Sequence, residues 1–262
     1  MTKHFIEYLL TAALAVMTAQ SCVSKIDPIF DESSANRVEA LAERLNETLT
    51  GAPNGWLLEY YPSSGQYYGG FNVFLSFSEG NKVKVGSEVA GKGKTATSTY
   101  SIYQSAGCVL TLDTYNEVMH YFADPETTGG QGAGFGFEGD FEFNVLDLQD
   151  EKITLKGRKT GSTMTMTPMP VSMSWDDYIV ALKEEESAIS KHTRIRYQTA
   201  DNKYDGRING RTLEIFSEVD GEQVTTSYPF IFNLMGVTFY KPLELGDERI
   251  DGLVYNPDMA DG

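Results

Sequence analysis

Short alternating runs between residues 55 and 167 most constrain what this chain can fold into. NKVKV and STMTMT alternate with a period of two, which places one row of side chains on a wet face and the other on a buried face. Seven further runs are rich in β-branched and aromatic residues: GWLLEYYP, FNVFLSF, STYSIYQ, CVLTLD, EVMHYFA, GDFEFNVLDL and KITLKGR. Turn signals such as SSG, SEGN, SAG and LQDE separate them. Closely spaced strands in series predict antiparallel meanders that form a barrel or a sandwich, and they disfavour a doubly wound α/β fold.

Two segments have helical rather than strand periodicity. SANRVEALAERLNETLTG places apolar residues at spacings of three and four, and Gly51 ends the pattern. SMSWDDYIVALKEEESAIS does the same, and Ser174 and Asp177 form a capping-box pattern at its start. We therefore expect one helix before the strands and another after them.

The chain as a whole is predicted to be mainly β, of the α+β class. We expect a helix and an antiparallel β domain over residues 33–170, and a smaller helix-plus-strands domain over residues 171–262. The boundary is set at PMP, residues 168–170, and the strands expected beyond the second helix are TRIRYQT, RTLEIFSEV, QVTTSYPFIFN and GVTFYKP. Because these strands are few and VYNPDMADG is turn-like, it stays open whether the second domain is complete.

The first 22 residues have the order of a secretory signal. Basic Lys3 precedes an apolar run over residues 8–16, which is shorter than the about 20 residues that span a bilayer. Ala19, Gln20 and Ser21 before Cys22 resemble a bacterial lipobox, although Gln20 replaces the usual small residue. We expect a signal peptide over residues 1–21, acylation of Cys22 and a tether over residues 22–32. Ordinary secretion with an unmodified Cys22 is the alternative.

Charge and cysteine content exclude some functions. The formal net charge is −16, from 37 acidic and 21 basic residues, so we expect no nucleic-acid partner, because phosphate binding depends on Lys and Arg. Cys108 is the one thiol left after Cys22, and a chain with a single free cysteine has no internal disulfide. Cys108 opens an apolar strand, where we expect a buried structural residue rather than a nucleophile paired with His120.

Four motifs behind the lipobox-like segment carry a resemblance to a known family: GWLLEYYP, LDTYNEVMHYFADP, GDFEFNVL and ITLKGRKTG. Over residues 22–260 the chain resembles a family of uncharacterised lipoproteins of Bacteroidota bacteria, a domain of unknown function. The resemblance implies an envelope lipoprotein, and relatives of such proteins often accompany TonB-dependent nutrient-uptake systems. The family has no agreed activity, so it assigns no functional residues.

DTYNEVMHYFADP holds a candidate site. In a helix Glu117, His120 and Asp124 would share a metal-binding face, whereas in a strand Glu117 and His120 face opposite ways. The β-branched and aromatic content favours a strand pair, CVLTLD and VMHYFA, joined by a turn at TYNE. We predict no metal site and keep His120 and Asp124 as candidate ligand-binding residues.

Aromatic residues supply the other candidates. Tyr67 and Tyr68 lie in WLLEYYPSSGQYYGGF, where exposed rings could stack on sugars or on a partner protein, and filling the core is the alternative. TTGGQGAGFGFEGD has dinucleotide-motif spacing but opens a strand instead of a helix, so we expect no cofactor. It is interpreted as a flexible loop that joins two strands; the alternative is that the loop gates or lines a site, and Phe135 and Phe137 are kept as candidate ligand-binding residues.

These observations predict an envelope lipoprotein that is a binding or accessory component of a surface nutrient-uptake or assembly system. Its expected partners are the membrane, through the lipid anchor, and an outer-membrane transporter or a glycan. A glycan- or peptide-binding surface protein is one alternative. A hydrolase with an acidic pair, Glu138 with Asp140 or Glu142, is another, but no catalytic residue is assigned.

Overall fold

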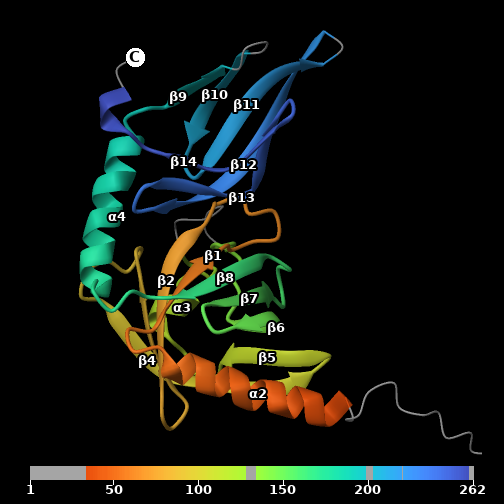
Figure 1. Cartoon of the computed structure of the whole chain (residues 1–262), viewed down its shortest axis with the longest axis vertical. Coiled ribbons are helices and arrows are strands. Elements are labelled where there is room, and N and C mark those ends of the chain that lie inside the picture. The colour runs from red at the N-terminus through yellow and green to blue at the C-terminus, as the bar shows by residue number, and fades with distance from the viewer. Residues whose placement is uncertain (1–33, 128–133, 199–202, 220, 260–262) are drawn as a thin grey trace, which may run out of the picture. The chain divides into compact units, whose positions relative to one another are not determined.

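The computed structural model describes residues 34–127, 134–198, 203–219 and 221–259 (Figure 1). Helix α2 (Ser34–Gly51) comes first, as the sequence predicts, and a closed barrel of eight antiparallel strands follows. The barrel strands are β1 (Trp56–Tyr60), β2 (Phe71–Ser78), β3 (Lys82–Ser87), β4 (Thr95–Ser105), β5 (Gly107–Leu112), β6 (Glu142–Gln149), β7 (Lys152–Gly157) and β8 (Thr163–Pro168). The prediction of a mainly β fold with a barrel or sandwich is confirmed, and the architecture is the barrel.

The barrel closes where its first strand pairs with its last. Each strand is hydrogen-bonded to the next one along the chain, and β1 also pairs with β8, where Glu59 lies opposite Thr165. On the other side of β1, Glu59 lies opposite Asn72 of β2. Because side chains alternate along a strand, Glu59 points away from the barrel interior while Leu58 and Tyr60 point into it.

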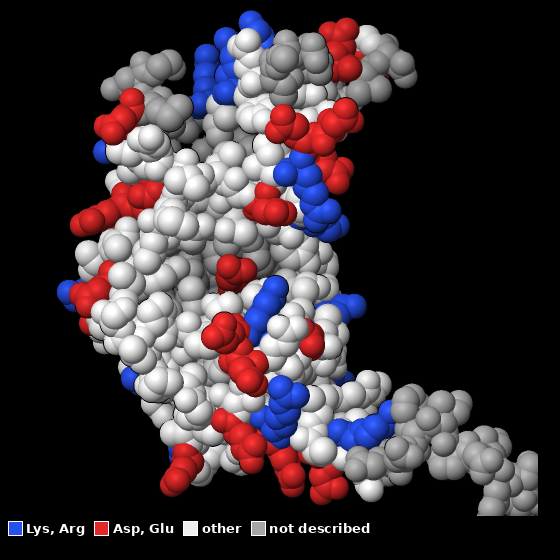
Figure 2. Space-filling model, viewed as in Figure 1, with Lys and Arg blue, Asp and Glu red and all other residues white. Residues whose placement is uncertain are grey.

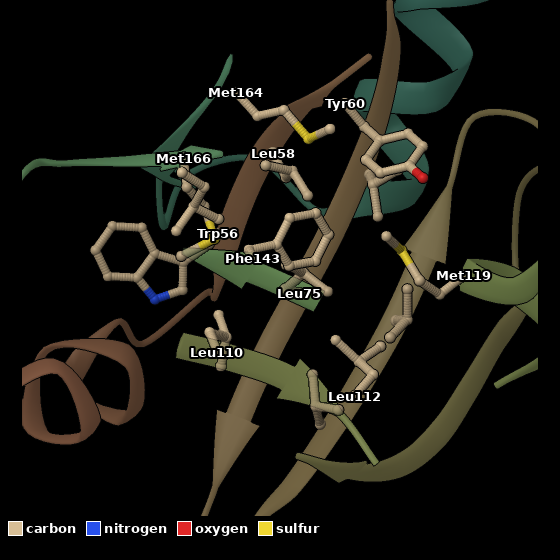
Figure 3. Close-up of a cluster of buried hydrophobic side chains, with 14 of the residues drawn as sticks. Trp56, Leu58, Tyr60, Leu75, Leu110, Leu112, Met119, Phe143, Met164 and Met166 are labelled. Atoms are coloured by element: carbon tan, nitrogen blue, oxygen red, sulfur yellow. The ribbon is translucent and has the colours of Figure 1, made fainter. Parts of the chain in front are cut away.

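The barrel interior is filled by large apolar side chains. Figure 3 shows Leu58 and Tyr60 of β1 meeting Phe143 of β6 and Met166 of β8 there, and all four are at most 1% exposed. Cys108 belongs to the same core and is 1% exposed, and burial raises the pKa of its thiol. These contacts bury enough apolar surface to make this cluster the main hydrophobic core of the barrel.

Helix α4 (Trp175–Ile189) connects the barrel to a second sheet. Ser174 caps it as predicted: its Oγ accepts a hydrogen bond from Asp177 N at 3.1 Å and donates one to Asp177 Oδ2 at 2.7 Å. Pro168 ends β8 and residues 169–170 lie between β8 and α4, and the domain boundary placed at residues 168–170 stays a prediction.

The second sheet has six antiparallel strands in the order β14-β13-β12-β11-β10-β9. They are β9 (Arg194–Gln198), β10 (Lys203–Asn209), β11 (Thr212–Val219), β12 (Glu222–Asn233), β13 (Gly236–Leu245) and β14 (Glu248–Val254), followed by the short helix η1 (Pro257–Met259). The sequence analysis missed β10 and β14. Among the described residues, none of the helices has the length and apolar character needed to cross a membrane.

A second hydrophobic cluster joins the sheet and α4 to the outer face of the barrel. Phe74 of β2 packs against Tyr178 of α4, with ring centroids 5.4 Å apart. Asn72 is buried beside them: its Nδ2 donates to Phe232 O at 2.9 Å, and its Oδ1 accepts from Tyr178 Oη at 3.2 Å. One buried side chain thus links the barrel, the helix and the sheet.

The predicted strand VMHYFA is wrong, because this segment begins with the helical turn α3 (Glu117–His120). Asn116 caps the turn: its Oδ1 accepts hydrogen bonds from Val118 N and Met119 N at 3.1 and 3.2 Å. Val118 and Met119 then face the core, followed by Phe122 on the same side. The cap and this spacing outweigh the β-branched and aromatic composition.

Candidate ligand-binding cleft

A cleft of about 780 Å³ lies between the barrel and the second sheet. We call it the tyrosine cleft. On the barrel side its lining comes from the segment that joins β1 to β2, residues 61–70, here named the tyrosine loop, and from Phe71 and Phe137. The lining used below comprises Gly65, Gln66, Tyr67, Tyr68, Phe71 and Phe137 from the barrel side, and Asn209, Arg211, Glu214, Tyr240 and Lys241 from the sheet.

The tyrosine loop is held in one conformation by its own hydrogen bonds. Ser63 and Gln66 have positive φ angles of 62° and 51°, a conformation that costs free energy for residues other than glycine. Ser63 is fully buried, and its carbonyl accepts from Ser162 Oγ at 2.7 Å while its Oγ accepts from Tyr67 N at 3.2 Å. Gln66 Nε2 donates to the same Ser162 Oγ at 3.0 Å. The loop is therefore preorganised, with strain concentrated beside the cleft.

Tyr67 presents a largely open aromatic ring at the cleft. The residue is 67% exposed, although the loop around it is anchored. Its ring lies against Gly65, where an added Cβ would stand 2.3 Å from Tyr67 Cζ. Glycine at position 65 thus lets the ring lie on the backbone, and the remaining ring surface is open to a ligand.

The neighbouring aromatic side chains pack edge-on against one another along one side of the cleft. Tyr68 contacts Phe137 edge-on, with ring centroids 5.0 Å apart, and its Oη donates to Gly136 O at 3.4 Å. Phe137 also contacts Phe71 at 5.5 Å and is 5% exposed. Phe137 therefore lines the cleft, whereas Phe135 is 59% exposed and lies outside the lining.

Arg211 connects the two sides of the cleft. Its guanidinium donates to Gly70 O at 2.6 Å, to Glu88 Oε1 at 2.8 Å and to Glu186 Oε1 at 2.9 Å. It also lies over the ring of Phe71, 4.5 Å from the centroid. The side chain is 11% exposed, so a mostly buried cation of the sheet binds the barrel and α4 together.

Glu214 supplies an ionised carboxylate on the sheet side. Its Oε1 accepts from Asn209 Nδ2 at 2.9 Å, and its Oε2 accepts from Arg207 Nε at 2.6 Å. The hydrogen bond from Asn209, together with that from Arg207, lowers the pKa of the Glu214 carboxyl. The Glu214 carboxylate can accept hydrogen bonds from a ligand, and the Asn209 amide can donate and accept them.

His120 has other partners and lies outside the cleft lining. Its ring stacks on Phe141, with centroids 4.7 Å apart and planes at 22°, and contacts Tyr115 at 5.0 Å. Its Nδ1 lies 3.1 Å from Asn116 O. Burial lowers the pKa of the His120 imidazole, although the contact with Asn116 opposes this.

Asp124 also lies outside the cleft lining, where its Oδ1 accepts from Glu126 N at 2.8 Å. Of the six predicted ligand-binding side chains, the cleft brings together Tyr67, Tyr68 and Phe137. Cys22, the predicted acylation site, lies outside the described residues.

The hydrolase alternative needs an acidic pair, Glu138 with Asp140 or Glu142. Asp140 is buried, and its carboxylate accepts hydrogen bonds from Lys159 N at 2.7 Å and Thr160 N at 3.0 Å, so it holds the turn between β7 and β8. Glu142 lies 3.8 Å from Arg158 Nε, and Glu138 has a positive φ of 57°. Within the described ranges, no cluster of three or more His, Cys, Asp or Glu side chains could hold a metal ion.

Comparison with protein-family models assigns the chain to a family. The model described as "Domain of unknown function (DUF4302)" matches residues 26–257, which include every lining residue of the cleft. The chain belongs to the DUF4302 family. The predicted resemblance to a family of unknown function is thereby confirmed. No curated protein and no solved structure matches this DUF4302 chain.

The sheet side of the DUF4302 cleft was missed by the sequence analysis. Asn209, Arg211 and Glu214 stand at the hairpin between β10 and β11, where Gly210 has a φ of 58°. Asn209 pairs with Thr212, so Gly210 and Arg211 are the two loop residues, and glycine at the first loop position is a hairpin signal that could have revealed β10. Nothing local in the sequence shows that this hairpin faces the tyrosine loop.

Proposed function

We propose that this DUF4302 protein is a non-catalytic binding protein of the bacterial envelope, and that a saccharide occupies the tyrosine cleft. The observation that supports this most directly is the ring of Tyr67, 67% exposed at a cleft and seated on Gly65 by a strained loop. A sugar ring has an apolar face that can lie on an aromatic ring, and its hydroxyl groups can bond the planar polar groups beside it. Gln66, Asn209 and Glu214 supply such groups.

Electrostatics favour a ligand without strong negative charge. The formal net charge is −16, and on the face shown in Figure 2 acidic side chains are spread over both the barrel and the sheet. A polyanion would be repelled by this field. A neutral saccharide avoids the repulsion.

A hydrolase function has less support than binding. A general acid or base works best when its pKa lies near the operating pH. In the cleft, the pKa of Glu214 is lowered by Asn209 and Arg207, so its carboxylate is not poised to exchange a proton near neutrality. Arg211, a cation that lines the cleft, is already bonded to Glu88 and Glu186.

Replacing Tyr67 with alanine is expected to weaken saccharide binding about tenfold, since stacking and lost apolar contact together amount to about 1.4 kcal/mol. Affinity electrophoresis against a panel of neutral polysaccharides identifies the ligand, and calorimetry then gives the dissociation constant. Tyr115→Ala is the matched control, because Tyr115 is 70% exposed and lies outside the cleft lining. The proposal fails if the parent binds no member of the panel, or if the Tyr67 and Tyr115 variants bind alike.

The envelope location is supported by the order of residues before Cys22. Lys3, an apolar run and small residues precede the cysteine, as in a lipoprotein signal. Several acyl chains at Cys22 would anchor the protein stably, since a single acyl chain gives only marginal membrane binding. In this proposal the anchored protein holds saccharide for an outer-membrane transporter.

Cys22→Ala is expected to release the protein from membranes, because the acyl chains have no other attachment site in this proposal. Fractionation of cells into soluble and membrane material, followed by detection of the chain, measures the change. Cys108→Ala serves as the control, since Cys108 lies in the barrel core. Equal membrane association of the Cys22 variant and the parent would contradict the anchor.

A further inference from the structure

A second cavity, of about 350 Å³, adjoins the tyrosine cleft and shares the lining residues Tyr240 and Lys241 with it. Its floor is the outer face of the barrel, where Glu59 of β1 lies beside Thr165 of β8. Its other walls come from Tyr61 and from residues 239–241 of β13. We call it the Glu59 cavity.

Glu59 brings an uncompensated carboxyl group into this cavity. Within the described part of the chain, its carboxylate makes no hydrogen bond and no ion pair, and Lys152 acts on it at longer range. Burial raises the pKa of the Glu59 carboxyl, and Lys152 opposes the shift. A half-buried carboxylate without partners is costly, so a cationic ligand would gain a counter-ion that the protein does not already use.

Aromatic side chains line the cavity together with Glu59. Tyr61 and Tyr240 contact each other with ring centroids 4.7 Å apart, and Tyr61 is 4% exposed. Tyr240 Oη accepts a hydrogen bond from Thr163 N at 3.0 Å, which fixes the ring against β8. Phe239, 6% exposed, completes the wall. Aromatic rings around a carboxylate are the combination that attracts an organic ammonium ion, through charge and cation–π contacts.

We infer that the Glu59 cavity binds the ammonium group of a small organic amine, with Glu59 as its counter-ion and the rings of Tyr61 and Tyr240 as its walls. Tyr240 and Lys241 line both cavities, but Glu59 and Tyr61 line only this one and Tyr67 lines only the tyrosine cleft, so the two proposals can be tested separately. Lys241 is the competing cation: it lines the same cavity, is exposed and makes no ion pair with Glu59. An amine that binds here must compete with the Lys241 ammonium group for the Glu59 carboxylate.

The test uses the full chain and n-butylammonium chloride as the probe, with n-butanol as the neutral analogue and sodium chloride to match ionic strength. Binding is followed by calorimetry and by ligand-observed NMR. We expect the parent to bind n-butylammonium at least tenfold more tightly than n-butanol, and Glu59→Gln to lose at least tenfold in affinity for the ammonium probe. Glu244→Gln, an exposed acid on β13, should bind as the parent does.

Two further variants separate the site from indirect effects. Lys241→Met should bind n-butylammonium more tightly than the parent, since the competing cation is gone. Tyr67→Ala should bind the amine unchanged even if it loses saccharide binding, so failure of one site is distinguishable from failure of the other. The inference is overturned if the parent does not bind the probe, if n-butanol binds equally well, or if Glu59→Gln binds like the parent. A melting temperature of Glu59→Gln at or above that of the parent shows that the variant is folded, as expected when a half-buried charge is replaced by an amide.

Discussion

Arg211→Ala is expected to lower the free energy of unfolding by about 3–5 kcal/mol, the cost of breaking a buried ion pair by removing one partner. The side chains of Arg211 and Glu88 are 11% and 0% exposed. Without the guanidinium, the Glu88 carboxylate keeps one hydrogen bond, from Asn72 N at 2.9 Å. Its Oε2 is buried and has no partner among the described residues even in the intact protein. The variant thus leaves a nearly uncompensated charge between the barrel and the sheet.

Urea denaturation, followed by far-ultraviolet circular dichroism, measures the loss. Arg196→Ala is the matched control, because Arg196 pairs with Asp205 at 2.6 Å while both side chains are more than half exposed, and such pairs contribute little. Adding Glu88→Gln to Arg211→Ala should recover part of the stability by removing the stranded charge. If Arg211→Ala were no more destabilising than Arg196→Ala, the ion pair would not hold the two sheets together.

The barrel follows from local pattern, and that is why the sequence predicts it. Alternation in NKVKV and STMTMT assigns each side chain to a face without reference to distant residues, and the structure places Val83, Val85, Met164 and Met166 in the core. The segment around His120 differs from the strand that its composition predicts, because the Asn116 cap stabilises a helical turn. Asn116, three residues before Met119, was the local signal for a helical turn.

The candidate site could be predicted in part. Clustered aromatics pointed to Tyr67, Tyr68 and Phe137, which the fold brings to one cleft. The role of Arg211 in the cleft could not be predicted from the sequence. Its hydrogen bond to Gly70 joins positions 141 residues apart, and no local pattern near either residue indicates the contact. Glu59 shows the same limit: alternation along β1 turns it outward, but pattern alone does not show that β13 covers it.

Gly69→Ala is expected to cost about 2–5 kcal/mol of unfolding free energy and to disturb the tyrosine cleft. Gly69 has a φ of 67°, which costs another residue about 1–2 kcal/mol. An added Cβ would also stand 2.3 Å from Arg211 Cβ, 2.7 Å from Arg211 O and 2.8 Å from Phe230 O. Two of these atoms are backbone and cannot rotate away, so overpacking adds about 1–3 kcal/mol.

Gly80→Ala carries only the first, conformational part of that cost, so comparison with it isolates the second, overpacking part. Gly80 has a φ of 72°, but an added Cβ would meet no atom within 4 Å. The Gly80→Ala variant should therefore lose only about 1–2 kcal/mol of unfolding free energy, the conformational cost. Thermal and urea unfolding of the two variants give the difference that belongs to the contact between the tyrosine loop and the sheet. Because Gly69 lies next to Gly70, whose carbonyl accepts from Arg211, the same variant should also weaken ligand binding in the cleft, whereas Gly80→Ala should not. Equal losses in the two variants would mean that the loop can move away from the sheet at no cost, and a preorganised cleft would then be excluded.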